Sequence, residues 1–185
     1  MSLLRLSSLA LIAVFSTVTL ASAQMATPVP NPKTDWSSMK FLLGTWTCKT
    51  VKNSMGRGTG RIETDINTMV MNGHYMQTDG TSKPFDKART ATLTTQGWVG
   101  YDSVKKNWYS AGVSNFGGMG VSTSPGWKGG TMVWTDMWNS DGQPLSVTTV
   151  VKNSATKTTG TTVTKTSKGT ETTSAVCTKS GGSMM

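Results

Sequence analysis

From Gly44 onward the chain is dominated by alternation of apolar and polar residues with a period of two. The segment 59–70 shows this most clearly, and we expect one of its faces to meet a core and the other to meet water. The two faces hold Ile62, Thr64, Ile66, Thr68 and Val70 on one side, and Arg61, Glu63, Asp65 and Asn67 on the other. Thr, Val, Trp and Tyr are frequent, and Gly or Asn-Gly marks the turns, which is typical of antiparallel β-structure.

This pattern predicts an all-β fold of about ten strands, with no helix of useful length between them. The predicted strands are 45–52, 59–70, 73–79, 91–101, 107–114, 118–123, 130–138, 145–152, 158–166 and 170–178. Sequential antiparallel strands with short turns favour an up-and-down β-barrel, which leaves no exposed sheet edge. A two-sheet sandwich is the alternative.

The predicted domain spans residues 35–179 and begins with one short N-terminal helix. Thr34 or Asp35 caps this helix, and Gly44 ends it. Its apolar face holds Trp36, Met39 and Leu43. Strands within 145–178 are rich in Thr and Lys and poor in large apolar side chains, so we expect thin packing there. Residues 180–185 are predicted to form a disordered tail.

Residues 1–23 have the three parts of a secretory signal peptide. Arg5 is the only charge before an apolar run, and Ala21-Ser22-Ala23 precedes a predicted cleavage near Ala23/Gln24. A retained anchor helix is the alternative. The pattern predicts a secreted or periplasmic protein with an extended, proline-containing leader over residues 24–34. No later segment is apolar enough to cross a membrane as a helix.

The two cysteines, Cys48 and Cys177, fall in the first and last predicted strands. Closing a barrel places those strands side by side, and an oxidising compartment favours a disulfide. Such a bond closes a loop of more than a hundred residues, for which chain entropy gives roughly 4–5 kcal/mol of stabilisation. Two separate buried thiols are the alternative.

The formal net charge is +9, and a basic balance raises the question of nucleic acid or another acidic partner. The lysines are scattered and are not interleaved with stacking aromatic residues, so we predict no nucleic-acid partner and interpret them as a solvated surface.

Most catalytic chemistries lack their residues in this chain. His74 is the only histidine, and no Gly-x-Ser-x-Gly elbow or phosphate-binding Gly-Lys-Ser/Thr sequence occurs. One His with two distant Cys does not make a zinc site. Asp102, Asp136 and Asp141 have no spacing that singles out a glycosidase pair. We therefore predict no enzyme activity and no cofactor.

A methionine and histidine group surrounds the predicted Asn72-Gly73 turn. Its members are Met69, Met71, His74 and Met76. Thioether sulfur and imidazole suit Cu(I), so copper binding is one hypothesis, and ordinary core packing of methionine is the other.

Aromatic residues indicate a candidate ligand pocket. Trp134, Asp136 and Trp138 are predicted to share a face of one strand, and Trp98 and Trp108 lie on neighbouring strands. If this face lines the barrel interior, it makes an aromatic pocket with a few polar groups, into which His74 and Tyr109 also reach. A fully packed small barrel is the alternative.

Four segments carry a resemblance to a known group of proteins. They are Phe41-Leu42-Leu43-Gly44-Thr45-Trp46, Met71-Asn72-Gly73-His74-Tyr75, Gly100-Tyr101-Asp102-Ser103-Val104-Lys105-Lys106 and Ser124-Pro125-Gly126-Trp127-Lys128-Gly129. A short helix followed by Leu-x-Gly-x-Trp at the first strand resembles the calycin superfamily of lipocalins, fatty-acid-binding proteins and nitrobindin-like barrels. The order and spacing are most similar to a family of bacterial secreted proteins with a lipocalin-like barrel, a domain of unknown function.

The resemblance implies a closed barrel with a short helix at one end, and no established activity. Two features of those barrels are missing. Strand 170–178 has no Arg to cover the tryptophan of the Gly-x-Trp motif, and no histidine lies near the C-terminus to hold haem.

Together these observations predict an exported, non-catalytic barrel that binds a small, largely apolar ligand. The alternatives are a structural protein whose strands 145–178 contact envelope polymers, and a periplasmic Cu(I)-binding protein.

Overall fold

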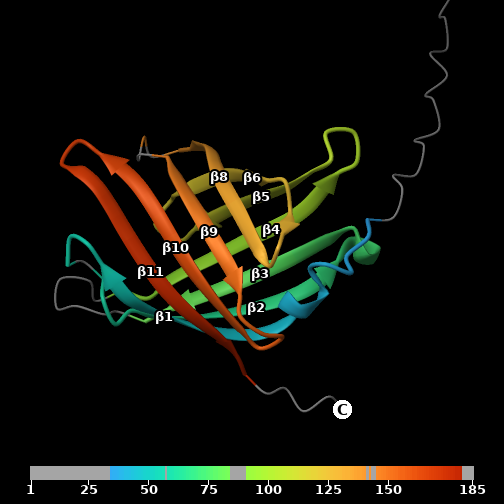
Figure 1. Ribbon diagram of the computed structural model, residues 1–185, viewed down its shortest axis with the longest axis horizontal. Coiled ribbons are helices and arrows are strands. Elements are labelled where there is room, and N and C mark those ends of the chain that lie inside the picture. Colours follow the sequence, from blue (N-terminus) through green and yellow to red (C-terminus); the bar gives the residue numbers. More distant parts are fainter. Residues whose placement is uncertain (1–33, 57, 84–90, 141, 143–144, 181–185) are drawn as a thin grey trace, which may run out of the picture. The chain divides into compact units, whose positions relative to one another are not determined.

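Ten antiparallel strands close into a barrel in the computed structural model, which describes residues 34–56, 58–83, 91–140, 142 and 145–180 (Figure 1). The strands are β1 (Gly44–Asn53), β2 (Ile62–Val70), β3 (Tyr75–Ser82), β4 (Leu93–Asp102), β5 (Asn107–Ser114), β6 (Met119–Ser124), β8 (Thr131–Asn139), β9 (Ser146–Lys152), β10 (Lys157–Thr166) and β11 (Gly169–Lys179). Each pairs with its neighbours in the chain, β11 pairs with β1, and β6 pairs with β8 to complete the ring. The prediction of an up-and-down barrel is confirmed, and the sandwich alternative is excluded.

All ten predicted strands correspond to strands of the barrel. The additional strand β7 (Trp127–Lys128) follows the predicted Ser124-Pro125-Gly126 turn and pairs only with the start of β8. The ten-stranded antiparallel barrel is consistent with a calycin-like fold.

The predicted N-terminal α-helix is not confirmed. A turn at residues 37–39 leads into a single 3-10 turn, η1 (Lys40–Leu42). If the helix continued, the Leu42 carbonyl would accept a hydrogen bond from the main-chain N–H four residues further along. Here that carbonyl instead accepts hydrogen bonds from Trp46 Nε1 at 2.7 Å and Asn67 Nδ2 at 2.9 Å. These contacts with the barrel end the helical turn early.

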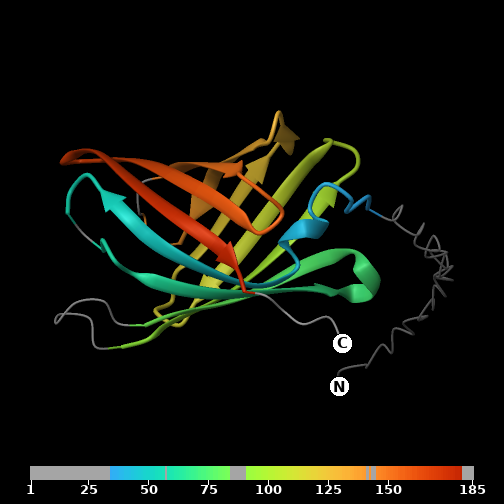
Figure 2. The same ribbon diagram turned by 60° about the horizontal axis from the view of Figure 1, so that its bottom comes forward.

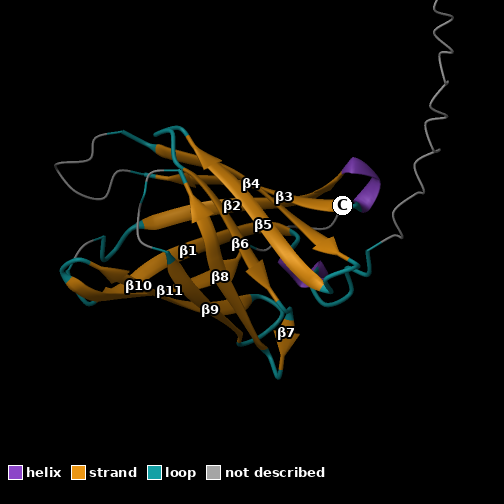
Figure 3. Ribbon diagram, turned by 90° about the horizontal axis from the view of Figure 1, so that it is seen from above, coloured by secondary structure: helices purple, strands orange, loops and turns teal. Residues whose placement is uncertain are grey.

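Residues 36–43, which we call the plug segment, lie across one end of the barrel (Figure 2). Trp36 Nε1 donates to the carbonyl of Gly73 at 2.8 Å, in the second 3-10 turn, η2 (Met71–Gly73). In Figure 3 both helical turns lie at ends of strands and not along the barrel wall. The largest buried cluster forms beneath the plug segment and contains Met39, Met76, Val99, Trp108 and Met132.

Strand β2 has the predicted alternation, and its polar face is the one that faces the barrel interior. Asn67 is only 9% exposed, whereas Ile62 and Ile66 are 50% and 46% exposed on the outside. Register explains the orientation, because Asp65 pairs with Trp46, a buried residue of β1. Side chains directly opposite each other in a sheet share a face. The isoleucine face therefore meets solvent.

The signal peptide predicted at 1–23 lies outside the described residues, as do most of the predicted leader and tail. Among the residues that the structure describes, no helix has the length and apolar character needed to span a membrane.

Candidate functional site

The barrel interior holds a cavity of about 380 Å³ that runs from the plug segment toward the middle of β2. We call it the inner cavity. Its apolar lining is Met39, Leu42, Met76, Val99, Trp127, Met132, Trp134 and Val150. Its polar lining is Asp65, Asn67, Thr78, Ser110, Ser122, Asp136 and Thr148. The cavity thus combines a continuous apolar surface with hydroxyl, amide and carboxyl groups.

The apolar end of the inner cavity is held rigidly by the plug segment. Met39 and Met132 are each 1% exposed, and Trp127 Nε1 donates a hydrogen bond to Met39 Sδ at 3.1 Å. Trp36 packs edge-on against Trp108, with ring centroids 4.9 Å apart. Close packing and a satisfied indole leave little freedom at this end.

Asn67 has a structural role in the cavity wall. Its amide nitrogen donates to the Leu42 carbonyl, and its Oδ1 accepts from Thr78 Oγ1 at 2.6 Å. A buried amide needs such partners to offset the cost of leaving water. Asn67 therefore ties the plug segment to β2 and β3.

Asp136 on β8 also has fixed partners. Its Oδ1 accepts from Ser122 Oγ at 2.8 Å, and its Oδ2 accepts from the Ser146 main-chain N–H at 3.0 Å. The carboxylate links β6, β8 and β9 while facing the inner cavity. Each oxygen has one donor, and each retains capacity for a second hydrogen bond.

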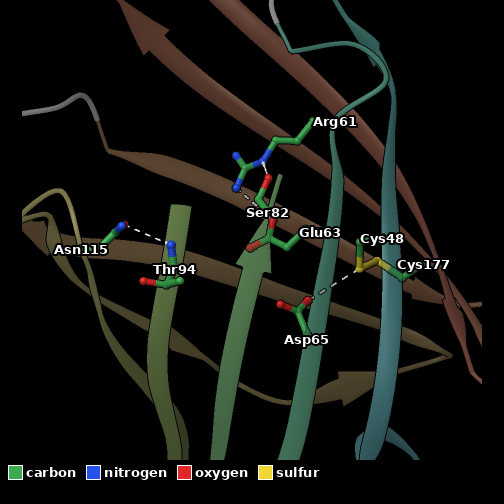
Figure 4. A network of polar contacts seen from close by, with 8 residues as sticks. All are labelled: Cys48, Arg61, Glu63, Asp65, Ser82, Thr94, Asn115 and Cys177. Carbon is green, nitrogen blue, oxygen red and sulfur yellow. Dashed lines mark hydrogen bonds and ion pairs between the residues drawn. A yellow bond between two sulfur atoms is a disulfide. The ribbon is translucent and has the colours of Figure 1, made fainter. Parts of the chain in front are cut away.

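Asp65 on β2 is the least satisfied carboxylate of the interior. It belongs to a group that we call the polar cluster, which comprises Arg61, Glu63, Asp65 and Ser82, drawn in Figure 4, together with Thr95, which pairs with Gly80. Burial, together with the nearby Glu63 carboxylate, raises the pKa of Asp65 to about 7, although the Arg61 guanidinium opposes the rise. Arg61 is committed elsewhere, with Nη2 3.1 Å from Glu63 Oε2 and Nε donating to Ser82 Oγ at 2.7 Å.

The Asp65 carboxyl also contacts the disulfide. Cys48 Sγ lies 3.8 Å from Asp65 Oδ2. A disulfide sulfur carries no proton, so this contact becomes a hydrogen bond only when the carboxyl is protonated and donates to sulfur. That arrangement agrees with a raised pKa for Asp65.

Gly80 on β3 makes room for the polar cluster. It pairs with Asp65, and a Cβ at this position would lie 2.9 Å from Asp65 Oδ1 and closer still to Thr95 Oγ1. Only glycine therefore fits without moving these side chains.

A second cavity of about 470 Å³ continues the interior past Thr78, Val99 and Ser110, which line both cavities. We call it the glycine cavity. One row of directly paired, inward-facing residues crosses its wall: Asn67, Thr78, Gly97, Gly112, Gly120 and Asn139. None of the three glycines has a positive φ. Their backbone conformation does not require glycine, and their effect is to leave the main chain bare toward the cavity.

The predicted aromatic residues divide between the two faces of the barrel. Trp134 and Asp136 line the inner cavity, and Trp108 is buried beneath the plug segment. Trp98 and Tyr109 alternate with the inward-facing Val99 and Trp108, so their rings lie on the outer face. Trp98 is nevertheless among the residues that border the glycine cavity.

The alternation of β8 predicted that Trp138 shares a face with Trp134 and Asp136. In the structure Trp138 lies on the opposite face. Ser122 pairs with Asp136, but the preceding Val121 pairs with Trp138, so Met137 is an extra residue in a β-bulge. A bulge of one residue reverses the direction of the side chains that follow. Trp138 is consequently 48% exposed on the outside.

The methionine and histidine group is also divided. Met69 and Met76 are paired and face the interior core, whereas Met71 is 65% exposed in η2. His74 is half-buried and follows η2 as its cap. Among the described residues, no three His, Cys, Asp or Glu side chains come together in a way that could hold a metal ion.

The predicted disulfide between Cys48 and Cys177 is confirmed. The two cysteines are 129 positions apart in the sequence. They are direct register partners on β1 and β11, which lie side by side in the barrel. Cys48 lies two residues from the buried Trp46 and therefore on the same face of β1, so the disulfide is on the interior face.

Sequence reasoning missed the polar cluster as a candidate site. Arg61, Glu63 and Asp65 were identified as one face of a strand, without a functional role. The available signal was the scarcity of large apolar residues opposite them, since Gly80 and Thr95 are their interior neighbours.

Comparison with known proteins adds no family to this picture: no family model matches the chain, and no curated protein matches it significantly. The case for a function therefore rests on the geometry of the interior.

Proposed function

We propose that this protein is a non-catalytic barrel that binds a small amphipathic molecule in its inner cavity. The observation that carries the proposal is the cavity of about 380 Å³, whose lining combines apolar side chains with hydroxyl, amide and carboxyl groups. Its volume falls within the roughly 300–1,000 Å³ of ordinary ligand sites. A mostly apolar wall with a few polar groups is the usual form of such sites.

Trp134, Met132 and Val150 supply apolar surface for the body of the ligand. Burial of that surface would contribute most of the affinity. Asp136 and Asp65 then orient the polar end, as Asp136 was predicted to do. The bare backbone of Gly97, Gly112 and Gly120 extends the room for a longer ligand.

We further propose that the protein is exported and belongs with the secreted lipocalin-like barrels that its sequence resembles. The support is the pattern of residues 1–23 and the Cys48–Cys177 disulfide, since such bonds persist in oxidising compartments. Mass spectrometry of the mature protein tests this directly. Cleavage next to Ala23 is the expected result, and an intact N-terminus in the cytosolic fraction would contradict it.

Native mass spectrometry of the protein purified from its own cells tests the binding function. We expect a non-covalent adduct that is released on unfolding. Ser110, which lines both cavities, provides the test: Ser110→Leu fills the space, while the control Thr135→Leu places a leucine at an exposed position of β8 that lines neither cavity. Loss of the adduct in Ser110→Leu alone is expected. An adduct that survives in Ser110→Leu, or a wild-type protein that carries none, would contradict the proposal.

A further inference from the structure

Charge is distributed unequally between the outside and the interior of this basic protein. The chain has a formal net charge of +9. The charged residues that line the inner cavity or belong to the polar cluster, however, are Arg61, Glu63, Asp65 and Asp136, which are three carboxyl groups against one guanidinium. Lys152 and Lys179 lie at the plug segment, where Lys152 Nζ is 4.1 Å from the centroid of the Phe41 ring and Lys179 Nζ donates to the Phe41 carbonyl at 3.1 Å. Low-dielectric walls strengthen the field of such charges inside a cavity. The interior is therefore suited to a cation.

Of the carboxyl groups at the inner cavity and the polar cluster, Asp65 is the one that accepts no hydrogen bond from an N–H or O–H group of the described residues. Glu63 is paired with Arg61, and Asp136 accepts from Ser122 and Ser146. Within the described part of the chain, the close contact of the Asp65 carboxyl is to a disulfide sulfur that has no proton to donate. A partly desolvated carboxylate gains most from a ligand that brings both hydrogen-bond donors and positive charge.

The position of Asp65 relative to the apolar wall defines the rest of the ligand. Asp65 lines the same cavity as Met132, Trp134 and Val150. A molecule that fills this cavity therefore meets apolar surface and the Asp65 carboxyl together. An inorganic cation would leave the apolar surface unfilled, and a neutral apolar molecule would leave the carboxyl buried without a partner.

We propose that the inner cavity takes an organic amine, whose apolar body packs against Met132 and Trp134 and whose ammonium group is bound by Asp65. This inference rests on the proposed binding function and specifies the chemical class of its ligand. The polar cluster supports the arrangement, since Gly80, which pairs with Asp65, has no side chain to cover the carboxyl, and the next residue across the sheet, Thr95, presents an uncharged hydroxyl.

The amine should bind more tightly as the pH rises from about 6 to about 8, because its ammonium group prefers the ionised form of Asp65. Glu63 and Arg61 are the charged groups that act on Asp65 from its own strand. The elements packed against it present the Cys48–Cys177 disulfide, Gly80 and Thr95, which carry no charge. An alkylammonium group stays protonated throughout this range, with a pKa of roughly 10.

Isothermal titration with octylamine, octanol and octanoate tests the inference, because these probes share a chain and differ in the charge of the head group. At about pH 8, we expect octylamine to bind roughly ten- to hundredfold more tightly than octanol, and octanoate to bind most weakly. Asp65→Asn should abolish the preference for octylamine and leave octanol binding unchanged. Asp79→Asn is the matched control, since Asp79 neighbours Gly80 on the outer face and pairs there with Gln77 and Gln96.

The outcomes separate this inference from the proposed function. Equal binding of octylamine and octanol, or an unchanged preference in Asp65→Asn, would overturn the amine while leaving cavity binding intact. If none of the three probes binds, both the inference and the proposed function are wrong. Octanol binding by Asp65→Asn also shows that the variant is folded.

Discussion

At the plugged end of the barrel, buried methionines and tryptophans pack together and form the apolar wall of the inner cavity, whereas the polar cluster occupies the interior further along β2 (Figure 4). Strand β2 contributes to both regions with the same inward face: Met69 joins the core, and Asp65 and Glu63 join the polar cluster. The contrast shows that this barrel gains its stability mainly at one end. The other end keeps desolvated charge and free volume, which cost stability and are typical of binding sites.

The disulfide should contribute the largest single stabilisation, because it joins the first and last strands across 129 positions. Reduction, or the double substitution Cys48→Ser with Cys177→Ser, should lower the free energy of unfolding by roughly 4–5 kcal/mol. Urea unfolding of the oxidised and reduced protein measures this. Similar unfolding midpoints for both forms would show that the pairing of β1 with β11 needs no covalent link.

Truncation at the plugged end should have the next largest effect. Met132→Ala removes a side chain that is almost fully buried, and it should cost about 2–5 kcal/mol through lost burial and the space left behind. Thr95→Ala, in the polar cluster, should cost less than about 1 kcal/mol. Chemical denaturation of both variants compares the two ends, and equal losses would remove the distinction between them.

Asp65 should make stability fall as the pH rises. Its folded pKa of about 7 lies above the ordinary value of 3.8 for an aspartate, so between these values the folded protein binds more protons than the unfolded chain. The stabilising contribution is complete below about pH 4 and is lost as the pH rises through about 7. Asp65→Asn should therefore stabilise the protein near pH 8 by on the order of 1–2 kcal/mol.

Thermal unfolding across this pH range measures the effect, with Asp79→Asn as the control. A wild-type stability that rises with pH between about 4 and 7 would show that Asp65 is well solvated or paired in the folded protein.

The smallest effect is expected on the outer face. Ile66→Thr changes a side chain that is 46% exposed, and it should alter the free energy of unfolding by less than about 0.5 kcal/mol. Asn67→Leu, one residue along, should be clearly destabilising because Leu42 and Thr78 would lose their partner. A larger loss in Ile66→Thr than in Asn67→Leu would reverse our assignment of the two faces.

The sequence was sufficient to predict the strands and the disulfide because both follow from local signals. Period-two alternation and glycine-containing turns mark each strand, and closing the ring brings Cys48 next to Cys177. The inward direction of Asp65 and Asn67 was not predictable in the same way. Alternation gives two faces, and here the interior contains the polar one because glycine, serine and threonine on the neighbouring strands leave room for it.

Two further features depended on contacts that no single segment contains. The direction of Trp138 is set by a bulge at Met137, which is visible only in the pairing of β8 with β6. The plug segment has a helical pattern, yet it ends after one 3-10 turn because Trp46 and Asn67 take the Leu42 carbonyl. In both places the tertiary partners override the local preference.

Titration of octanol into the pair Ser110→Leu and Thr135→Leu tests the central claim that the interior of this barrel is a ligand site. The two substitutions introduce the same side chain, one at a position that lines both cavities and one at an exposed position of β8 that lines neither. We predict that Thr135→Leu binds octanol like the wild type and that Ser110→Leu does not bind it. Equal octanol binding by both variants would contradict the account.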